Sequence, residues 1–243
     1  MAKSKARQPS SRLSSEVRTA DILAAARTVL AQKGYENVVL ADIAREAGIV
    51  EGTIYRYFEN KRDLLVKVAE AWFGEQLAID SVLPLIHGTQ NKIRHLAART
   101  LTIIKSEPVL CRFMLMELRP DPNYRGSAFF ELNRRYTRET LQVFKDAVAS
   151  GEFRNDIPPS LLRDMLHGCI EHRTWAFLRG EGDFSVDEIA SNIATVVYRG
   201  MVAGPMAAPA AESGRLDTVV GRLEAIADRL DPAPRQNAGP ARR

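Results

Sequence analysis

Two short amphipathic segments constrain the fold of this chain more than any other feature. Residues 41–48, ADIAREAG, and residues 52–58, GTIYRYF, each favour a helix and are separated by a turn that begins at Gly48. Isolated helices of about seven residues are unstable in water, because nucleation costs more than so few hydrogen bonds return. The two segments therefore need apolar walls from neighbouring elements, which predicts a packed helical domain.

Longer predicted helices on both sides can supply those walls. In the first, which starts near Arg18, apolar residues recur at the spacing of one buried helix face, and Gly34 is a suitable end because glycine tolerates the left-handed conformation. The second is predicted from Lys61 to about Ile79. The apolar residues of the two helices are Ile22, Ala25, Ala26, Val29 and Leu30, then Leu64, Leu65, Val68, Trp72 and Phe73. The unit is a helix-turn-helix held in a small bundle.

The remainder of the chain also has the pattern of helices. No segment shows the strict alternation or the β-branched clusters that are typical of strands. The predicted helices are 89–105, 108–118, 124–150, 158–179 and 186–202. The predicted fold class is therefore all-α, with an N-terminal three-helix helix-turn-helix domain and a larger C-terminal helical domain.

Changes in composition divide the chain into six expected parts. They are a disordered basic arm at 1–15, a helix-turn-helix domain at 16–62, a larger helical domain at 63–202, a linker at 203–214, an accessory amphipathic helix at 215–231 and a disordered tail at 232–243. The accessory helix has heptad spacing. It either docks on its own subunit or contacts another one.

Charge and cysteine content narrow the function classes. Residues 1–62 hold eleven Lys or Arg against seven Asp or Glu, which accounts for the whole net charge of +4 and suggests a polyanionic partner. Cys111 and Cys169 lie in apolar helical patterns, so buried thiols are expected rather than disulfides or a zinc finger. No run is long and apolar enough for a membrane span or a signal sequence, and a cytoplasmic location without a cofactor is expected.

The second short segment has the properties of a DNA recognition helix. An α-helix fits the major groove and presents its N-terminal residues to base edges. Gly52 removes side-chain bulk where the backbone approaches the sugar-phosphate wall, and Thr53 offers a hydroxyl and a methyl group. Ile54 and Phe58, four residues apart, are expected to point inward.

The tyrosines of this segment then fall on the other side of the helix. Tyr55 and Tyr57 can donate from their phenolic hydroxyls to phosphate oxygens on the rim of the groove. Lys61 adds an ammonium group at the start of the next helix. The alternative for each of these residues is ordinary packing or solvation.

At these residues the sequence resembles the N-terminal domain of TetR-family (tetracycline-repressor-type) transcriptional regulators. The resemblance covers about residues 18–73 and rests on Gly34-Tyr35, Asp42-Ile43-Ala44, Ala47-Gly48, Gly52-Thr53, Tyr55, Tyr57-Phe58, Lys61 and Leu64-Leu65. It implies that double-stranded operator DNA is the partner. The implied DNA-binding residues are Arg18, Val50, Glu51, Gly52, Thr53, Tyr55, Tyr57 and Lys61.

Three positions depart from the family pattern. Val39 stands where Ser or Thr usually caps the second helix, Ala41 stands where a longer polar residue is frequent, and Val50-Glu51 replaces a common Ser-Arg or similar pair. A lost cap hydroxyl costs about 1 kcal/mol of helix stability unless another group replaces it. Glu51 either complements the helix dipole or accepts a hydrogen bond from a cytosine amino group.

The resemblance also implies that residues 16–62 bind DNA and that residues 63–202 form a ligand-binding and dimerisation domain, with a homodimer and an effector cavity. The dimer would form through the helices at 158–179 and 186–202, although apolar stripes there are equally compatible with a core inside one subunit. An apolar or flat small molecule would be held by aromatic and thioether side chains with a few polar groups. The candidate ligand-binding residues are Trp72, Arg99, Phe113, Met116, Glu117, Phe129, Asn133, Tyr136, His167, Glu171 and Trp175.

The sequence thus predicts a repressor that binds a palindromic operator as a dimer and is released by a small apolar or amphipathic molecule. One alternative is a DNA-binding regulator or activator that needs no effector. Another is an enzyme, for which His167, Glu171 and His172 would be a zinc site. Their spacing argues against it, because His172 lies five residues from His167 and points away, so neither catalytic nor metal residues are expected.

Overall fold

The computed structural model describes residues 11–79, 82–203 and 221–223. Its helices are α1 (Ser11–Asn37), α2 (Leu40–Glu46), α3 (Glu51–Ile54), α4 (Lys61–Ala78), η1 (Leu83–Leu85), α5 (Thr89–Ser106), α6 (Pro108–Phe113), η2 (Met114–Leu118), η3 (Tyr124–Gly126), α7 (Ala128–Ala149), α8 (Pro159–Leu178) and α9 (Val186–Met201). Over these described ranges there is no β-strand, only an isolated antiparallel bridge between Phe153 and Val202. The all-α prediction is confirmed.

The chain divides into two compact units, residues 1–202 and 203–243. Of the second unit the structure describes Ala203 and one helical stretch at 221–223. Residues 204–214 of the predicted linker at 203–214, most of the accessory helix at 215–231 and the tail at 232–243 lie outside the described residues. Residues 1–10 of the predicted arm lie outside them as well.

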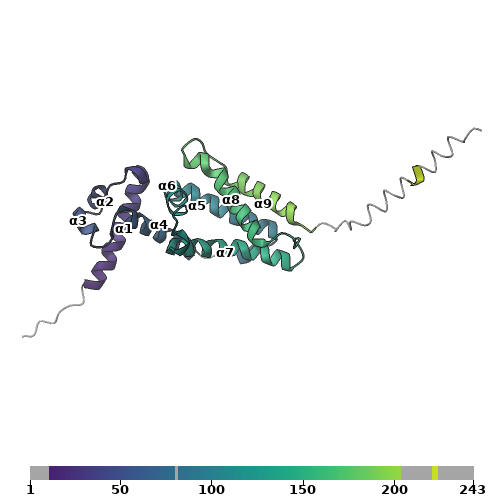
Figure 1. Ribbon diagram of the computed structural model, residues 1–243, viewed down its shortest axis with the longest axis horizontal. Coiled ribbons are helices and arrows are strands. Elements are labelled where there is room, and N and C mark those ends of the chain that lie inside the picture. The colour runs from purple at the N-terminus through teal and green to yellow at the C-terminus, as the bar shows by residue number, and fades with distance from the viewer. Residues whose placement is uncertain (1–10, 80–81, 204–220, 224–243) are drawn as a thin grey trace, which may run out of the picture. The chain divides into compact units, whose positions relative to one another are not determined.

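Helices α1 to α4 form the expected bundle around the two short helices (Figure 1). Ile43 of α2 and Ile54 of α3 are fully buried against Leu30 of α1 and Leu64 of α4, all with 0% exposure. Gly48 takes a φ of 64° between the short helices, a conformation that suits glycine. The predicted packing of short helices on long neighbours is confirmed.

Two boundaries differ from the predicted ones. Helix α1 begins at Ser11, so residues 11–15 are helical and do not belong to a disordered arm. Extending an existing helix costs little, because each added residue gains a hydrogen bond without a new nucleation step. At the other end a kink at Gly34, with φ 73°, marks the predicted helix end, and helical structure continues to Asn37.

The recognition segment is shorter than a full helix. Helix α3 covers only Glu51–Ile54, and a turn carries the chain onward, with the Tyr57 amide donating to the Ile54 carbonyl at 2.9 Å. Asn60 then caps α4 by accepting from the Asp63 amide at 2.9 Å. The start of α4 is thereby placed directly after the recognition segment.

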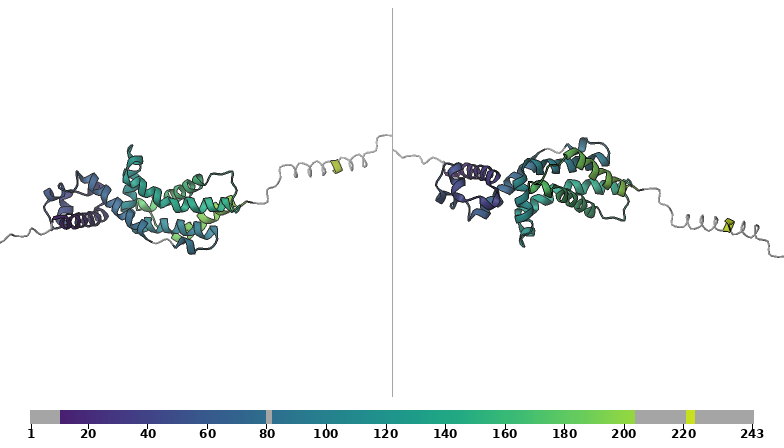
Figure 2. Two further views of the ribbon diagram at one scale, coloured as in Figure 1. Left: turned by 90° about the horizontal axis from the view of Figure 1, so that it is seen from below. Right: turned by 90° about the horizontal axis from the view of Figure 1, so that it is seen from above.

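Helices α5, α7, α8 and α9 pack against one another and run side by side in both views of Figure 2. Each contributes a stripe of buried apolar residues, such as Leu96, Phe144, Leu166 and Ile193. Helix α6, which contacts α1, α5 and α8, continues into η2, a π-helical turn. Because π-turns often occur at functional sites, η2 marks a segment of interest.

Candidate DNA-binding surface and effector cavity

The turn before α3 and the first residues of α3 form an exposed ridge. Val50 is 74% exposed, and Glu51, Gly52 and Arg56 are exposed as well. Tyr55 is 56% exposed, which places it on the same outer side. We call Val50, Glu51, Gly52, Tyr55 and Arg56 the recognition ridge.

The inner side of the same segment is closed. Ile54 is 0% exposed and Phe58 is 5% exposed, so the prediction that they point inward is confirmed. Thr53 and Tyr57 are half-buried at the edge between the two sides. The segment is therefore anchored by two apolar side chains and free on its outer side.

Gly52 is not required by the folded chain itself. Its φ is not positive, and a Cβ atom added there would meet no heavy atom within 4 Å. Neither backbone conformation nor crowding inside the described chain explains a glycine at this position. An external partner that approaches the backbone closely would explain it.

Lys61 has partners inside the chain. Its ammonium group donates to the carbonyl oxygens of Tyr35 at 3.3 Å and Val38 at 3.1 Å, and it lies 5.1 Å from the centre of the Tyr35 ring. It thereby ties the start of α4 to the end of α1. This contact positions the recognition segment, and Lys61 is half-buried as a whole.

Reasoning from sequence missed Arg56 as a basic residue of the ridge. Its side chain is exposed and has no hydrogen-bond or ion-pair partner within the described residues. The only available signal was its place between Tyr55 and Tyr57. Arg18, which was predicted, is exposed and 3.8 Å from Asp21.

A buried carboxylate supports the second helix. Asp42 is 9% exposed and accepts from Lys33 at 2.6 Å and from Arg45 at 3.0 Å. The hydrogen bond from Lys33 lowers the pKa of Asp42, so the carboxylate stays charged. No side-chain cap is present at Val39 or Val50, in agreement with the departure noted from the sequence.

Helix α4 and the C-terminal helices line a partly open cavity of about 450 Å³, a volume typical of small-molecule sites. Its wall is largely apolar and comes from α4, α5, α6, η2, α7 and α8. The residues that line it are Phe73, Thr100, Ile103, Ile104, Cys111, Met114, Leu115, Arg119, Phe129, Phe130, Asn133, Arg134, Tyr136, Thr137, Arg163, Asp164, His167, Gly168, Ile170 and Glu171. Three arginines thus border an apolar interior.

The predicted ligand-binding residues divide between several places. Phe129, Asn133, Tyr136, His167 and Glu171 line the cavity, whereas Phe113, Met116 and Glu117 line a separate hollow of about 270 Å³ next to Tyr35.

Three further candidates lie in neither cavity. Trp72 is 2% exposed in the core, and Trp175 is half-buried. Arg99 binds Glu139 at 2.6 Å and lies over the ring of Tyr136, behind the cavity wall.

Two hydrogen bonds shape the polar side of the cavity. Tyr136 and Thr100 share a hydrogen bond of 2.8 Å between their hydroxyl groups, and His167 Nε2 is 3.3 Å from the Thr140 hydroxyl. Burial lowers the pKa of His167 from 6.5 to about 4, with a further contribution from the nearby Arg163. The imidazole is therefore neutral at pH 7.

This lowered pKa predicts acid sensitivity. His167 binds a proton in the unfolded chain below pH 6.5 but in the folded chain only near pH 4, so the free energy of unfolding should fall between these values by at most about 3 kcal/mol. The His167→Gln variant should have a flatter profile of melting temperature against pH. His95, whose pKa burial also lowers, stays in both proteins and cancels in the comparison. Identical profiles would contradict the assignment.

The stretch of chain that forms one wall of the cavity is hydrogen-bonded to the start of α4. Arg62 donates to the Asp121 carboxylate at 2.6 Å and to the Glu117 carbonyl at 3.2 Å. Met114, Leu115 and Arg119, which line the cavity, belong to the same stretch of chain. A change in this stretch on ligand binding would therefore act on Arg62, one residue from Lys61.

Two other ion pairs connect the same regions. Arg27 of α1 binds Glu107, which immediately precedes α6, and Arg112 of α6 is 3.2 Å from Glu36 of α1. Arg119 itself is paired with Glu171 at 2.6 Å across the cavity. Charged contacts therefore link the first helices to the segment that forms one wall of the cavity.

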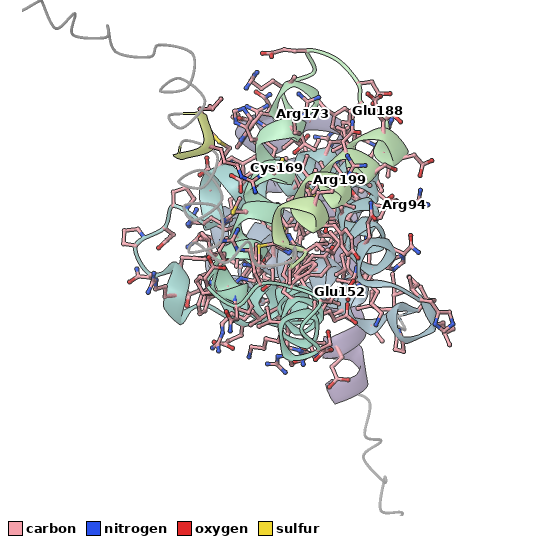
Figure 3. The ribbon with its side chains drawn as sticks, turned by 90° about the vertical axis from the view of Figure 1, so that its right-hand side faces the viewer. Arg94, Glu152, Cys169, Arg173, Glu188 and Arg199 are labelled. Atoms are coloured by element: carbon pink, nitrogen blue, oxygen red, sulfur yellow. The ribbon has the colours of Figure 1, made fainter. Side chains whose placement is uncertain are left out.

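The outer sides of α8 and α9 form a second exposed surface. Figure 3 shows Cys169 and Arg173 of α8 close to Glu188 and Arg199 of α9, and all four are exposed. Among them lie exposed apolar residues: Leu161 at 48%, Met165 at 56% and Val196 at 72%. We call this the α8/α9 face.

The apolar residues of α9 divide between this face and the interior of the subunit. Ile189, Ile193 and Met201 of α9 are 7%, 6% and 3% exposed, so they pack inside the subunit, as the alternative interpretation required. The expectation that Cys169 is buried was wrong, whereas Cys111 is buried as expected. Successive residues of a helix lie about 100° apart around its axis. Periodicity therefore identifies apolar stripes but does not show which of them faces outward.

The residues of the considered zinc site have other partners. His167 lies against Thr140, Glu171 binds Arg119, and His172 is exposed. In the described part of the chain no three His, Cys, Asp or Glu side chains are grouped to hold a metal ion. None of the described helices has the length and hydropathy of a membrane span.

The bundle with its exposed recognition ridge defines a helix-turn-helix DNA-binding regulator. Comparison with known families agrees: residues 22–68 match the model for bacterial regulatory proteins of the tetR family, and residues 88–201 match the tetracyclin repressor-like C-terminal domain. The chain belongs to the TetR family of DNA-binding transcriptional regulators. The predicted family is thus confirmed.

Similar proteins cover most of the chain at low identity. The fatty acid metabolism regulator protein of Bacillus subtilis is 21% identical over 74% of this chain and 93% of its own length. The HTH-type transcriptional repressor KstR2 of Rhodococcus jostii is 23% identical over 76% and 91%. These relatives are transcriptional regulators and not enzymes.

Solved structures share the fold. FadR from Bacillus subtilis, in complex with stearoyl-CoA, has a TM-score of 0.64 at 21% identity and is matched over 74% of this chain and 98% of its own. NalD, the secondary repressor of the MexAB-OprM multidrug efflux pump in Pseudomonas aeruginosa, has a TM-score of 0.54 at 21% identity, over 78% and 98%.

Proposed function

We propose that this regulator is a repressor that binds a palindromic operator as a homodimer and is released by an amphipathic small molecule. The observation that carries the proposal is the cavity of about 450 Å³, whose wall residues Met114, Leu115 and Arg119 belong to the same stretch of chain as Glu117 and Asp121. These two residues accept hydrogen bonds from Arg62 at the start of α4. A regulator without an effector would have no need of a hollow in this place. The effector-independent alternative is therefore the less favoured one.

The cavity supports an effector with an apolar body and an anionic end. Phe73, Ile103 and Phe129 supply apolar surface, while the arginines at 119, 134 and 163 border the same space. Guanidinium groups bind carboxylates and phosphates in a bidentate manner. Stearoyl-CoA, which FadR from Bacillus subtilis holds in its structure, has this combination of properties, so long-chain acyl thioesters are the first compounds to test.

The release mechanism requires that the effector binds one conformation more tightly than the DNA-bound one. An occupant would push on Met114 and Leu115 of η2, and the same segment holds Arg62. A tilt of α4 would then change the spacing of the two recognition ridges in the dimer. Half-sites one helical turn apart, about 34 to 36 Å, tolerate little change of this spacing.

The test is release of DNA by defined compounds. Duplexes selected by the full chain from a random pool would be bound and then titrated with long-chain acyl-CoA, the free fatty acid and coenzyme A alone. The amphipathic thioester should release DNA and raise the melting temperature, whereas coenzyme A alone should do neither. Selected DNA that no amphipathic compound releases would favour the effector-independent regulator.

The recognition ridge supports the DNA-binding part of the proposal through Gly52. The Gly52→Ala substitution should leave the fold intact or stabilise it slightly, because alanine has the better helix propensity and the added Cβ meets no atom. Operator affinity should nevertheless fall by about 1 kcal/mol or more per subunit, because the Cβ intrudes where the backbone approaches the DNA. Binding would be measured by fluorescence anisotropy, beside thermal unfolding.

The matched control is Gly74→Ala in α4, where an added Cβ also meets no atom within 4 Å. It should gain similar helix stability and keep its operator affinity. Equal affinities of both variants and the original chain would show that the backbone at Gly52 does not approach DNA.

A further inference from the structure

We propose that Val50 and Glu51 read neighbouring bases of each operator half-site, Val50 a thymine methyl group and Glu51 a cytosine amino group. The inference rests on the proposed function and specifies what the operator contains. It concerns the two residues at which this chain departs from the pattern expected for its recognition segment.

The exposure of Val50 is the first observation. At 74%, it is the most exposed large apolar side chain among the described residues of α1 to α4, and it lies at the tip of the recognition ridge. Nothing in the fold of these helices uses its methyl groups. In the major groove the complementary apolar feature is the C5-methyl group of thymine.

The isolation of Glu51 is the second observation. Its carboxylate is exposed and has no hydrogen-bond or ion-pair partner within residues 11–79. Complementing the helix dipole explains little, because α3 has only four residues and few aligned peptide groups. An acidic side chain on a DNA-binding ridge is repelled by phosphates unless it finds a donor there.

The chemistry of the groove selects that donor. Cytosine presents an amino group and no acceptor on its major-groove edge, whereas adenine presents its amino group beside the N7 acceptor, which repels a carboxylate. Guanine and thymine present only acceptors and the methyl group. A carboxylate therefore favours cytosine over the other three bases.

The adjacency of the two residues fixes the spacing of the two bases. Consecutive Cα atoms are about 3.8 Å apart, and duplex DNA rises about 3.4 Å per base pair. Val50 and Glu51 therefore reach the same base pair step. Each half-site should contain a thymine and a cytosine on the same or adjacent base pairs, on either strand.

The first experiment tests Val50. The full chain selects its operator from random duplex DNA, and the thymine nearest the conserved cytosine is replaced by deoxyuridine, which lacks only the methyl group. Affinity should fall about fourfold per half-site, the value for one buried methyl group. Val50→Ala should bind both DNAs equally, whereas Val39→Ala, at a valine that is 52% exposed, should still distinguish them.

The second experiment tests Glu51 by a change of specificity. Replacing the cytosine base pair should weaken binding by about 5- to 100-fold per half-site. Glu51→Gln should prefer adenine there, because an amide can bond to both N6 and N7. Glu59→Gln removes the same charge from an exposed glutamate in the same domain and should keep the preference for cytosine.

The outcomes separate this inference from the proposed function. An enriched palindrome without the thymine and cytosine pair would overturn the inference while the repressor stands. The same holds for an operator whose binding is insensitive to deoxyuridine and to Glu51→Gln. If the chain enriches no DNA sequence, the repressor function itself fails and the inference falls with it.

Discussion

The Val196→Glu substitution is expected to weaken operator binding by about 10²- to 10⁴-fold while each subunit stays folded. Val196 is 72% exposed on the α8/α9 face, so a glutamate there disturbs nothing inside the subunit. In a dimer joined through this face, the carboxylate would be buried without a partner, which costs several kcal/mol. The monomer would bind a single half-site. It would lose the increase in affinity that two linked subunits obtain by binding both half-sites, which is about 10²- to 10⁴-fold.

Leu85→Glu provides the matched control. Leu85 is 78% exposed in η1, away from α8 and α9 in the chain, and the same change of charge there should leave both mass and affinity unaltered. Light scattering would report the mass and fluorescence anisotropy the affinity. A dimeric Val196→Glu protein with normal affinity would remove the α8/α9 face from the interface.

The two cysteines give an independent measure of the same interface. Cys169 is exposed on the face, whereas Cys111 is 3% exposed and burial raises the pKa of its thiol to about 12. Only Cys169 should therefore react quickly with a thiol reagent. It should be protected in the dimer and reactive after Val196→Glu.

The sequence was sufficient to predict the fold. The short segments on either side of Gly48 are not stable as isolated helices, and their longer neighbours have regular apolar faces that must be buried. A packed bundle meets both requirements. The inward positions of Ile54 and Phe58 follow from their spacing of four residues. Regular periodicity also located the long helices of the C-terminal domain to within a few residues.

The candidate sites were less accessible to sequence reasoning because they depend on tertiary contacts. The role of Lys61 at the end of α1 depends on where the carbonyl groups of Tyr35 and Val38 lie. Periodicity identifies apolar stripes, but it cannot show that Ile193 faces inward while Val196 faces outward. The arginines that border the cavity had the pattern of solvated surface residues.

The Arg62→Ala substitution is expected to uncouple effector binding from DNA release. Arg62 joins α4 to the Glu117 carbonyl and to Asp121, whose pKa is lowered by the Asn123 amide and by Arg62 itself, so that this carboxylate stays charged. Without the arginine, a movement of the cavity wall is no longer transmitted to the start of α4. The factor by which effector weakens operator binding should fall by about 5- to 150-fold, the usual range of allosteric coupling.

Measurement of all four affinities, for DNA and effector alone and together, separates coupling from simple loss of binding. Asp121→Asn removes the charge from the other side of the contact and should reduce coupling in the same direction but by less, because the Glu117 carbonyl remains. Arg154→Ala removes an exposed arginine whose ion-pair partner among the described residues is Asp156, and it should leave coupling intact. If Arg62→Ala still releases DNA at the original effector concentration, the signal does not pass through Arg62. It would then pass through one of the two described ion pairs between α1 and the α6 segment. These pairs are Arg27 with Glu107 and Arg112 with Glu36.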